Sequence, residues 1–116
     1  MTSIEYGTFY GCNSLTSLDI PNSVTIIEDN AFAYCDSLIS IDIPDSVTNI
    51  GRNAFVSCDS LISVKIPNSV IAIGEHAFSG CKELILTVER DSYAEQYAEE
   101  NDIPYTYTDA NDWLTS

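Results

Sequence analysis

The chain has 116 residues, of which 45% are hydrophobic, and 18 acidic residues against four basic ones give it a formal net charge of −14. Such a chain fits one domain and is too apolar for a disordered tail, while its acidity argues against nucleic acids and anionic membrane surfaces as partners. No apolar run reaches the roughly 18 residues of a membrane helix, and the first residues lack the basic start and apolar stretch of a signal peptide. We interpret the acidic excess as a solubility coat, with attraction for cationic partners or calcium as the alternative.

The sequence repeats itself with a period of 23 residues. Residues 30–51 read NAFAYCDSLISIDIPDSVTNIG, and residues 53–74 read NAFVSCDSLISVKIPNSVIAIG. A fixed period of this length predicts a solenoid, in which each repeat forms one coil and contacts only its neighbours. Equivalent positions recur as Cys12/Cys35/Cys58/Cys81, Phe9/Phe32/Phe55/Phe78, Leu15/Leu38/Leu61/Leu84, Pro21/Pro44/Pro67, Val24/Val47/Val70 and Ile4/Ile27/Ile50/Ile73.

The chain begins in mid-repeat, because residues 1–4 align with residues 24–27. We therefore expect no polar cap over the first coil, and its interior side chains Phe9, Leu15, Leu18 and Ile20 should be uncovered on one side. An uncovered end with an edge strand predicts a homodimer in which two molecules meet there around a two-fold axis.

A full repeat predicts three short segments. Residues 30–35 carry alanine, phenylalanine and cysteine at helical spacing and predict a single helical turn. Residues 38–43 have the L-x-x-I-x-I pattern of a strand, which Pro44 ends because proline has no amide hydrogen for the ladder. Residues 47–50 predict a second, shorter strand, followed by Gly51 with a positive φ. The side chains expected to face inward are Ala31, Phe32, Cys35, Leu38, Ile41, Ile43, Val47 and Ile50.

The pattern changes after residues 84–88, which repeat the strand with one residue deleted. Residues 92–101 predict a helix that Asp91 or Ser92 caps, with Glu95 completing a capping box and with an apolar stripe along one side. Residues 103–107 predict a final strand, and residues 109–116 a frayed end. We divide the chain into a solenoid, residues 1–88, and an acidic cap, residues 89–116, that shields the last coil. The predicted stripe consists of Tyr93, Ala94, Tyr97 and Ala98.

The four cysteines occupy one position in successive coils, which places them in a line about 5 Å apart. A disulfide is feasible at this distance, but a line of sulfurs cannot converge on a tetrahedral zinc ion. The position faces the coil interior, where free cysteine is commonly buried. We predict buried free thiols, with a bridged pair as the second interpretation and a metal site as the third.

No set of residues has the spacing of a catalytic site. The single histidine, His76, lies on an outer turn, the cysteines point inward, and no phosphate-binding loop occurs. Asp36 over Asp59 and Asp19 over Asp42 stack like charges, but no loop has the EF-hand or nonapeptide calcium pattern, so we interpret these residues as solvated turn residues. We predict no enzyme activity, no metal and no cofactor, with a hydrolase as a remote alternative.

The outward face of the L-x-x-I-x-I strands is the candidate binding surface. Side chains alternate between the two faces of a strand, and repeat proteins bind partners on their concave faces. The isoleucine after each corner leucine is either part of an exposed apolar strip or a packing residue tucked under its neighbour. We expect a protein or a surface glycan as the partner. The candidate residues are Ile39, Ser40, Asp42, Ile62, Ser63 and Lys65.

The motif A-F-x-x-C-x-S-L-x-S-I-x-I-P-x-S-V-x-x-I-G, which runs from Ile4 to about Val88, resembles the leucine-rich repeat of the BspA-like, or Treponema pallidum, type. The tail SYAEQYAEENDIPYTY is similar to the segment that follows such arrays. The resemblance implies a right-handed α/β leucine-rich-repeat solenoid with the L-x-x-I-x-I strands in one parallel sheet. It also implies an extracellular or cell-surface location and a role in adhesion or protein binding. The leading hypothesis is a non-catalytic interaction or adhesion module, a fragment of a larger cell-surface protein, and the alternative is a purely structural spacer.

Overall fold

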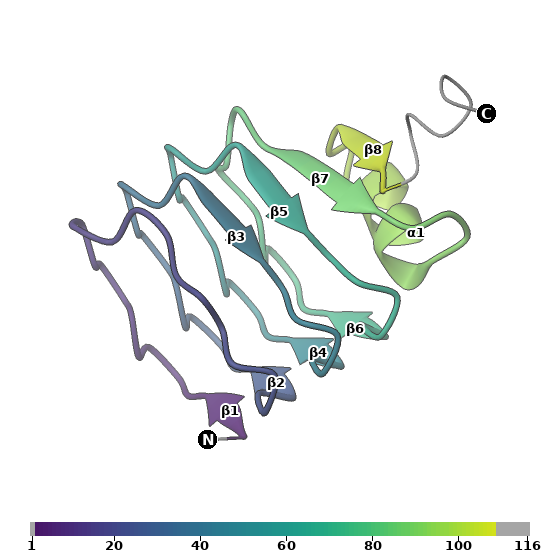
Figure 1. The fold of residues 1–116 in the computed structure, drawn as a ribbon. Helices are drawn as coiled ribbons and strands as arrows, with labels where there is room; N and C mark the ends of the chain where they lie inside the picture. The colour runs from purple at the N-terminus through teal and green to yellow at the C-terminus, as the bar shows by residue number, and fades with distance from the viewer. Residues whose placement is uncertain (1, 109–116) are drawn as a thin grey trace.

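The computed structural model describes residues 2–108, and the frayed end expected at residues 109–116 lies outside them. The chain winds into stacked coils, and a helix covers the last one (Figure 1). Two parallel four-stranded sheets run along the stack, which confirms the predicted solenoid. The narrow sheet contains β1 (Ser3–Ile4), β2 (Ile26–Ile27), β4 (Asn49–Ile50) and β6 (Ala72–Ile73) in that order. The wide sheet contains β3 (Ser40–Asp42), β5 (Ser63–Lys65), β7 (Ile85–Val88) and β8 (Tyr105–Tyr107).

The strand register follows the sequence repeat. Asn49 pairs with Ala72 in the narrow sheet, one period away. Between β5 and β7, Ser63 pairs with Ile85, so the register is one residue short. This shift confirms the deletion read from the sequence, and it keeps Leu86 and Val88 buried in the core.

The core is a column shared by all coils. The eight side chains predicted to face inward in residues 30–51 are all buried, with at most 3% of their surface exposed. At the centre, the four phenylalanine rings stack almost in parallel, with centroids 5.1, 4.9 and 5.2 Å apart. The Tyr97 ring ends this stack, edge-on to Phe78 at 6.3 Å. Each coil therefore depends on the next coil for part of its buried surface.

The single helical turn predicted at residues 30–35 is not formed, and a run of tight turns replaces it. The N–H groups of Ala33 and Cys35 donate to carbonyls three residues back, whereas those of Phe32 and Tyr34 donate to carbonyls of the next coil. An α-helix would keep these bonds within the segment. Asn30 and Tyr34 also have φ angles of 59° and 60°, which a right-handed helix does not contain. Bonding between coils has replaced bonding within the turn.

The positive φ predicted for Gly51 is also wrong, because Gly51 is not among the residues with positive φ. Gly51 instead allows two coils to pack closely, because it has no side chain. A Cβ atom at this position would lie 2.5 Å from Asp29 Oδ1 and 2.6 Å from Asp29 N, both in the preceding coil. Gly74 is in the same situation, 2.5 Å from Arg52 N. A side chain at either position would push the coils apart.

The helix α1 (Tyr93–Glu100) forms as predicted and closes the stack. The hydroxyl of Ser92 accepts a hydrogen bond from Glu95 N at 3.1 Å, which confirms the N-cap, while the Glu95 carboxylate accepts one from Asp91 N at 2.7 Å. Ala94, Tyr97 and Ala98 are buried, but Tyr93 is 39% exposed. No helix within residues 2–108 has the length and apolar character needed to cross a membrane.

Candidate functional site

The structure brings the six candidate residues together on β3 and β5 and directly before them. Ser40 pairs with Ser63 and Asp42 with Lys65 in the strand register. The isoleucines before these strands are neighbours too, since Ile62 N donates to Ile39 O at 2.9 Å. The result is a continuous surface with a row of isoleucines, a row of serines and a row of charged residues. We call it the sheet-face patch, and it consists of Ile39, Ser40, Asp42, Ile62, Ser63 and Lys65.

The two isoleucines of the sheet-face patch are exposed. Ile39 has 46% of its surface accessible and Ile62 has 50%, so the alternative in which they tuck under a neighbour is wrong. Ile85 on β7, which pairs with Ser63, is a third isoleucine on this face, with 48% exposed. The residues between the outward positions, Ile41 and Val64, are buried and hold the strands on the core. The patch therefore includes an apolar strip beside strands that are anchored in the core.

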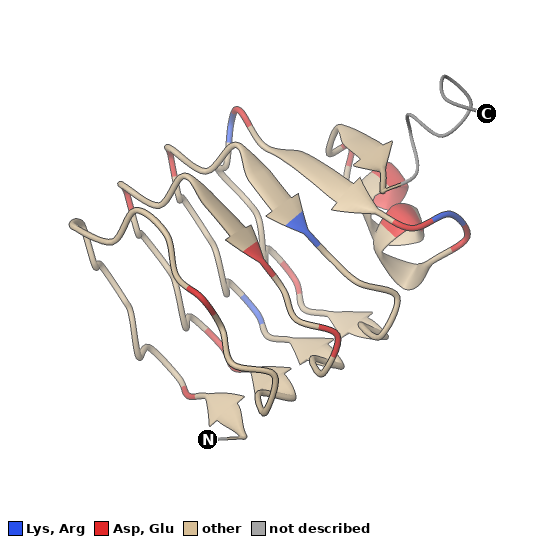
Figure 2. Cartoon of the chain, viewed as in Figure 1, with Lys and Arg blue, Asp and Glu red and all other residues tan. Residues whose placement is uncertain are grey.

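The sheet-face patch carries one acidic and one basic side chain at equivalent positions of neighbouring coils. Asp42 ends β3 and Lys65 ends β5, and Figure 2 shows these strand ends as neighbouring red and blue segments. Asp19 occupies the equivalent place in the preceding coil, and Thr87 the place beyond Lys65. The row of Asp42 and Lys65 thus carries charge, and the row of Ile39 and Ile62 forms the apolar strip.

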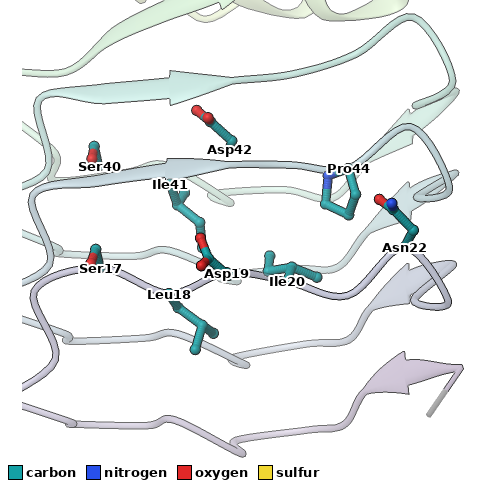
Figure 3. A pocket seen from close by; sticks show the side chains of 9 residues that line it. All are labelled: Ser17, Leu18, Asp19, Ile20, Asn22, Ser40, Ile41, Asp42 and Pro44. Carbon is teal, nitrogen blue, oxygen red and sulfur yellow. The ribbon is translucent and has the colours of Figure 1, made fainter.

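A hollow of about 320 Å³ adjoins the sheet-face patch between the first coil and β3 (Figure 3). It exists because residues 17–20 form no strand, and the bond from Ile39 N to Thr16 O, 3.0 Å long, ties only the start of this segment to β3. The repeat pattern alone predicted a strand here. Hydroxyl, carboxylate and amide groups line much of the opening, and two of its residues belong to the patch. The polar lining residues are Ser17, Asp19, Asn22, Ser40 and Asp42.

The cysteines are unbridged thiols, as predicted, but only Cys35 and Cys58 are fully buried, whereas Cys12 and Cys81 are partly exposed. Cys35 Sγ donates to Phe9 O at 3.0 Å, and the same bond recurs from Cys58 to Phe32 O at 3.1 Å. Burial raises the pKa of Cys35, and the pKa of Cys58 is raised by its hydrogen bond with Cys81 and by burial. Both thiols therefore stay protonated, which makes them poor nucleophiles.

The remaining reactive groups do not form a catalytic arrangement within residues 2–108. This part of the chain contains no group of three or more histidine, cysteine or acidic side chains placed to hold a metal ion. His76 is exposed, as predicted, but its Nδ1 lies 3.0 Å from the Ser79 hydroxyl, a pair that sequence reasoning missed. Both residues lie on one exposed turn, and a nucleophile of this kind would need a third group to orient the base.

Sequence reasoning also missed exposed aromatic and aliphatic side chains outside the wide sheet. Tyr6 is 69% exposed and Ile71 67% exposed. A signal for Tyr6 was present in the repeat, because Asp29, Arg52 and Glu75 occupy the equivalent positions of later coils. A position that takes charged residues in other coils lies on the surface.

The repeat matches known proteins in sequence and in structure. The family model for the BspA type leucine rich repeat region matches residues 1–97 with six copies of the repeat. The crystal structure of the T. pallidum leucine rich repeat protein TpLRR is similar, with a TM-score of 0.65, 32% identity, and coverage of 74% of this chain and 51% of that one.

A leucine rich cell surface protein from Faecalibacterium prausnitzii A2-165 matches with a TM-score of 0.71 and 36% identity, over 85% of this chain and 25% of that one. The chain thus spans about half of the first protein and a quarter of the second. No match was found among curated protein sequences. The repeat pattern, the parallel coils and the family match together show that this chain belongs to the BspA-type leucine-rich repeat family.

Proposed function

We propose that this chain is a non-catalytic protein-interaction module of a larger cell-surface protein, and that its partner docks on the sheet-face patch. The observation that carries the proposal is the half-exposed apolar strip, in which Ile39 and Ile62 lie directly before the strands β3 and β5. Family membership supports a repeat module of this kind, and the cell-surface protein that the chain resembles supports the location.

The chemistry of the surface indicates what the partner offers. The isoleucine row favours an apolar contact, which gains roughly 25 cal/mol per Å² of buried apolar surface. Asp19 and Asp42 beside this row favour a basic group at the edge of the contact, because rim charges set orientation and specificity. A protein with an apolar centre and a lysine or arginine at the rim fits both features.

A surface glycan is the second candidate ligand, and the hollow beside β3 favours it. Its lining of hydroxyl, carboxylate and amide groups offers the donors and acceptors that sugar hydroxyls require. A ligand held there would touch Ser40 and Asp42 without covering Ile62. Adhesion through either ligand is part of the proposed role.

Binding of the whole chain to a panel of purified matrix proteins and to a glycan array tests the proposal. We expect the double variant Asp42→Lys/Ile62→Glu to lose at least about tenfold in affinity for a protein ligand, which corresponds to 1.4 kcal/mol. The matched control Asp45→Lys/Ile71→Glu changes the same residue types at exposed positions outside the wide sheet and should bind normally.

The outcomes separate the rival functions. Unchanged binding by Asp42→Lys/Ile62→Glu would remove the sheet-face patch from consideration. Absence of any ligand for this chain, with binding retained by the rest of a longer parent protein, would favour the structural spacer. Turnover in a hydrolase screen would contradict a non-catalytic module.

A further inference from the structure

Another hollow lies along the narrow sheet, on a different side of the stack from the wide sheet and its sheet-face patch (Figure 1). It has a volume of about 350 Å³ and spans three consecutive coils. The first coil supplies a tyrosine, the chain around β2 supplies the middle, and the chain around β4 supplies the far side. We call it the Tyr6 pocket. Its lining residues that are not buried are Tyr6, Ile26, Glu28, Asp29, Asn49 and Gly51.

The exposure of Tyr6 is a property of its position in the coil. Tyr6 is 69% exposed, and the equivalent Asp29 and Arg52 are exposed although a coil lies on each side of them. Ile20, predicted to be uncovered in the first coil, is 8% exposed, close to the 3% of the equivalent Ile43. Exposure at these positions therefore follows the repeat, and the Tyr6 pocket extends from the ring toward the following coils.

The hollow exists at this place because one side chain is missing. Glu28 is followed one period later by Gly51, which adds no side chain to the pocket. A Cβ atom at Gly51 would lie 2.7 Å from the backbone carbonyl carbon of Glu28. The third coil therefore packs closely on the second and leaves space beside the carboxylates of Glu28 and Asp29. Ile26, 41% exposed, adds an apolar wall.

Two polar side chains of the Tyr6 pocket are held in place by the protein. Asp29 Oδ1 accepts a hydrogen bond from Arg52 N at 2.8 Å. Asn49 Oδ1 accepts one from the Thr48 hydroxyl, also at 2.8 Å. These bonds fix both side chains and leave Asp29 Oδ2 as an acceptor and Asn49 Nδ2 as a donor for a ligand. Because the two groups are already oriented, a ligand loses little free energy in ordering them.

The chemistry of the lining favours a sugar. One face of a sugar ring carries C–H groups that pack on the apolar face of an aromatic ring such as Tyr6. The rim of the sugar carries hydroxyls, which both donate and accept and so match a carboxylate beside an amide. The charged lining residues, Glu28 and Asp29, are both acidic and disfavour carboxylated or sulfated sugars. The volume lies within the range of small-ligand sites, about 300–1,000 Å³.

We propose that the Tyr6 pocket binds an uncharged sugar residue of a glycan. The sugar ring packs on Tyr6, and its hydroxyls form hydrogen bonds with Asp29 and Asn49. This site goes beyond the proposed docking of a protein on the sheet-face patch and shares no residue with it. It also shares none with the hollow beside β3. A glycan and a protein partner can therefore occupy the chain together.

Titration of the whole chain with neutral oligosaccharides that contain glucose, galactose, mannose or N-acetylglucosamine tests the proposal, with sialylated and sulfated oligosaccharides as the anionic arm. We expect at least one neutral oligosaccharide to bind and the anionic ones to bind more weakly. In amide NMR spectra the signals of Gly51 and Arg52 should shift on binding, whereas those of Ile62 and Lys65 should not. Tyr6→Ala should weaken binding about tenfold or more, because it removes the aromatic surface.

Matched variants separate the Tyr6 pocket from other surfaces. Tyr6→Phe keeps the ring and should retain most of the affinity, and Tyr34→Ala removes a tyrosine that is 43% exposed outside the pocket and should bind normally. Asp29→Asn keeps the oxygen that accepts from Arg52 N but replaces the second acceptor with a donor, so it should bind more weakly. Circular dichroism checks that each variant is folded.

The outcomes are independent of the proposed protein docking. Asp42→Lys/Ile62→Glu should bind the sugars normally even where it loses a protein partner. Loss of sugar binding in that variant, with Tyr6→Ala unchanged, would place the glycan in the hollow beside β3 and overturn the proposal. So would the absence of binding by any neutral oligosaccharide at millimolar concentration, or equal losses in Tyr6→Ala and Tyr34→Ala.

Discussion

The turns of each coil depend on two residues in the left-handed backbone region. One position is occupied in successive coils by Gly7, Asn30, Asn53 and His76, with φ between 56° and 65°. Glycine, asparagine and histidine are among the residues that tolerate this region best. The second position is occupied by Gly11, Tyr34, Ser57 and Gly80, with φ between 54° and 81°. At Tyr34 and Ser57 the chain therefore carries backbone strain that the glycines of the same column avoid.

Ser57→Gly should stabilise the protein. The φ of 54° at Ser57 destabilises a residue with a side chain by about 1–2 kcal/mol. Glycine removes this strain, but its greater backbone entropy in the unfolded chain costs roughly 0.5–1 kcal/mol. We expect the free energy of unfolding in urea to rise by about 0.5–1 kcal/mol. The matched control is Ser60→Gly, at an exposed serine without a positive φ, and it should lower the free energy of unfolding. Equal effects of the two substitutions would contradict the strain at Ser57.

At the scale of elements, the stacked phenylalanines join the coils in addition to the short strands and the hydrogen bonds between turns. Each ring contacts the ring of the next coil at about 5 Å, a separation at which aromatic pairs add to the energy of burial. The strands of the narrow sheet contain only two residues each. Stability should therefore depend on the position of a phenylalanine along the stack.

Phe55→Ala and Phe9→Ala test this dependence. Phe55 is fully buried between two rings, whereas Phe9 is partly buried and stacks on one ring only. We expect Phe55→Ala to cost about 3–5 kcal/mol of unfolding free energy, the usual cost for a buried phenylalanine, and Phe9→Ala to cost clearly less. Chemical denaturation measures both, and a larger loss at Phe9 would mean that the open end is packed in solution.

The cap makes stability sensitive to alkaline pH. Burial raises the pKa of Tyr97 from its ordinary 10.0 to about 12, so the fold favours the neutral phenol. The sign follows from linkage: this contribution is complete below pH 10 and is lost as pH rises toward 12. Hydrogen bonds to Glu99 and Glu95 raise the pKa of Tyr105 and Tyr107 in the same direction.

Tyr97→Phe should therefore flatten part of the decline in unfolding free energy between pH 10 and 12, measured by urea unfolding at each pH. The variant keeps the ring that ends the phenylalanine stack, so its stability at neutral pH should change little. The slope that remains belongs to Tyr105 and Tyr107, both on β8. An unchanged slope would show that Tyr97 titrates in the folded protein at its ordinary pKa.

For the whole molecule, the net charge of −14 acts against compactness. Two carboxylates of the cap form hydrogen bonds. Glu99 accepts one from the Tyr105 hydroxyl at 2.8 Å, and Glu95 accepts one from the Tyr107 hydroxyl. Most other acidic residues lie exposed on turns and coil edges (Figure 2). Their mutual repulsion is long-ranged at low salt and is screened beyond about 8 Å at physiological ionic strength.

Raising sodium chloride from low to physiological concentration should therefore increase the free energy of unfolding, by about 1 kcal/mol, because self-repulsion of the compact state is relieved. Urea unfolding at several salt concentrations measures the change, with sucrose at matched osmolality as the control. A decrease with salt would show that attractive ion pairs outweigh the repulsion.

The repeat period by itself determined the stack of coils and the inward columns from Ala31 to Ile50, because burial of a shared core demands the same side chains at the same place in every coil. The capping signal at Ser92 and Glu95 and the apolar stripe after it determined the capping helix. The tertiary structure alone decided the left-handed turns at Asn30 and Tyr34, and the role of Gly51 as a contact point, because these depend on where the neighbouring backbone lies. It also decided that Ile39 and Ile62 are exposed and that the first coil leaves a hollow beside β3. Those features depend on whether a neighbouring segment covers a side chain. The pattern of residue types within one coil does not say how close the neighbouring segment lies.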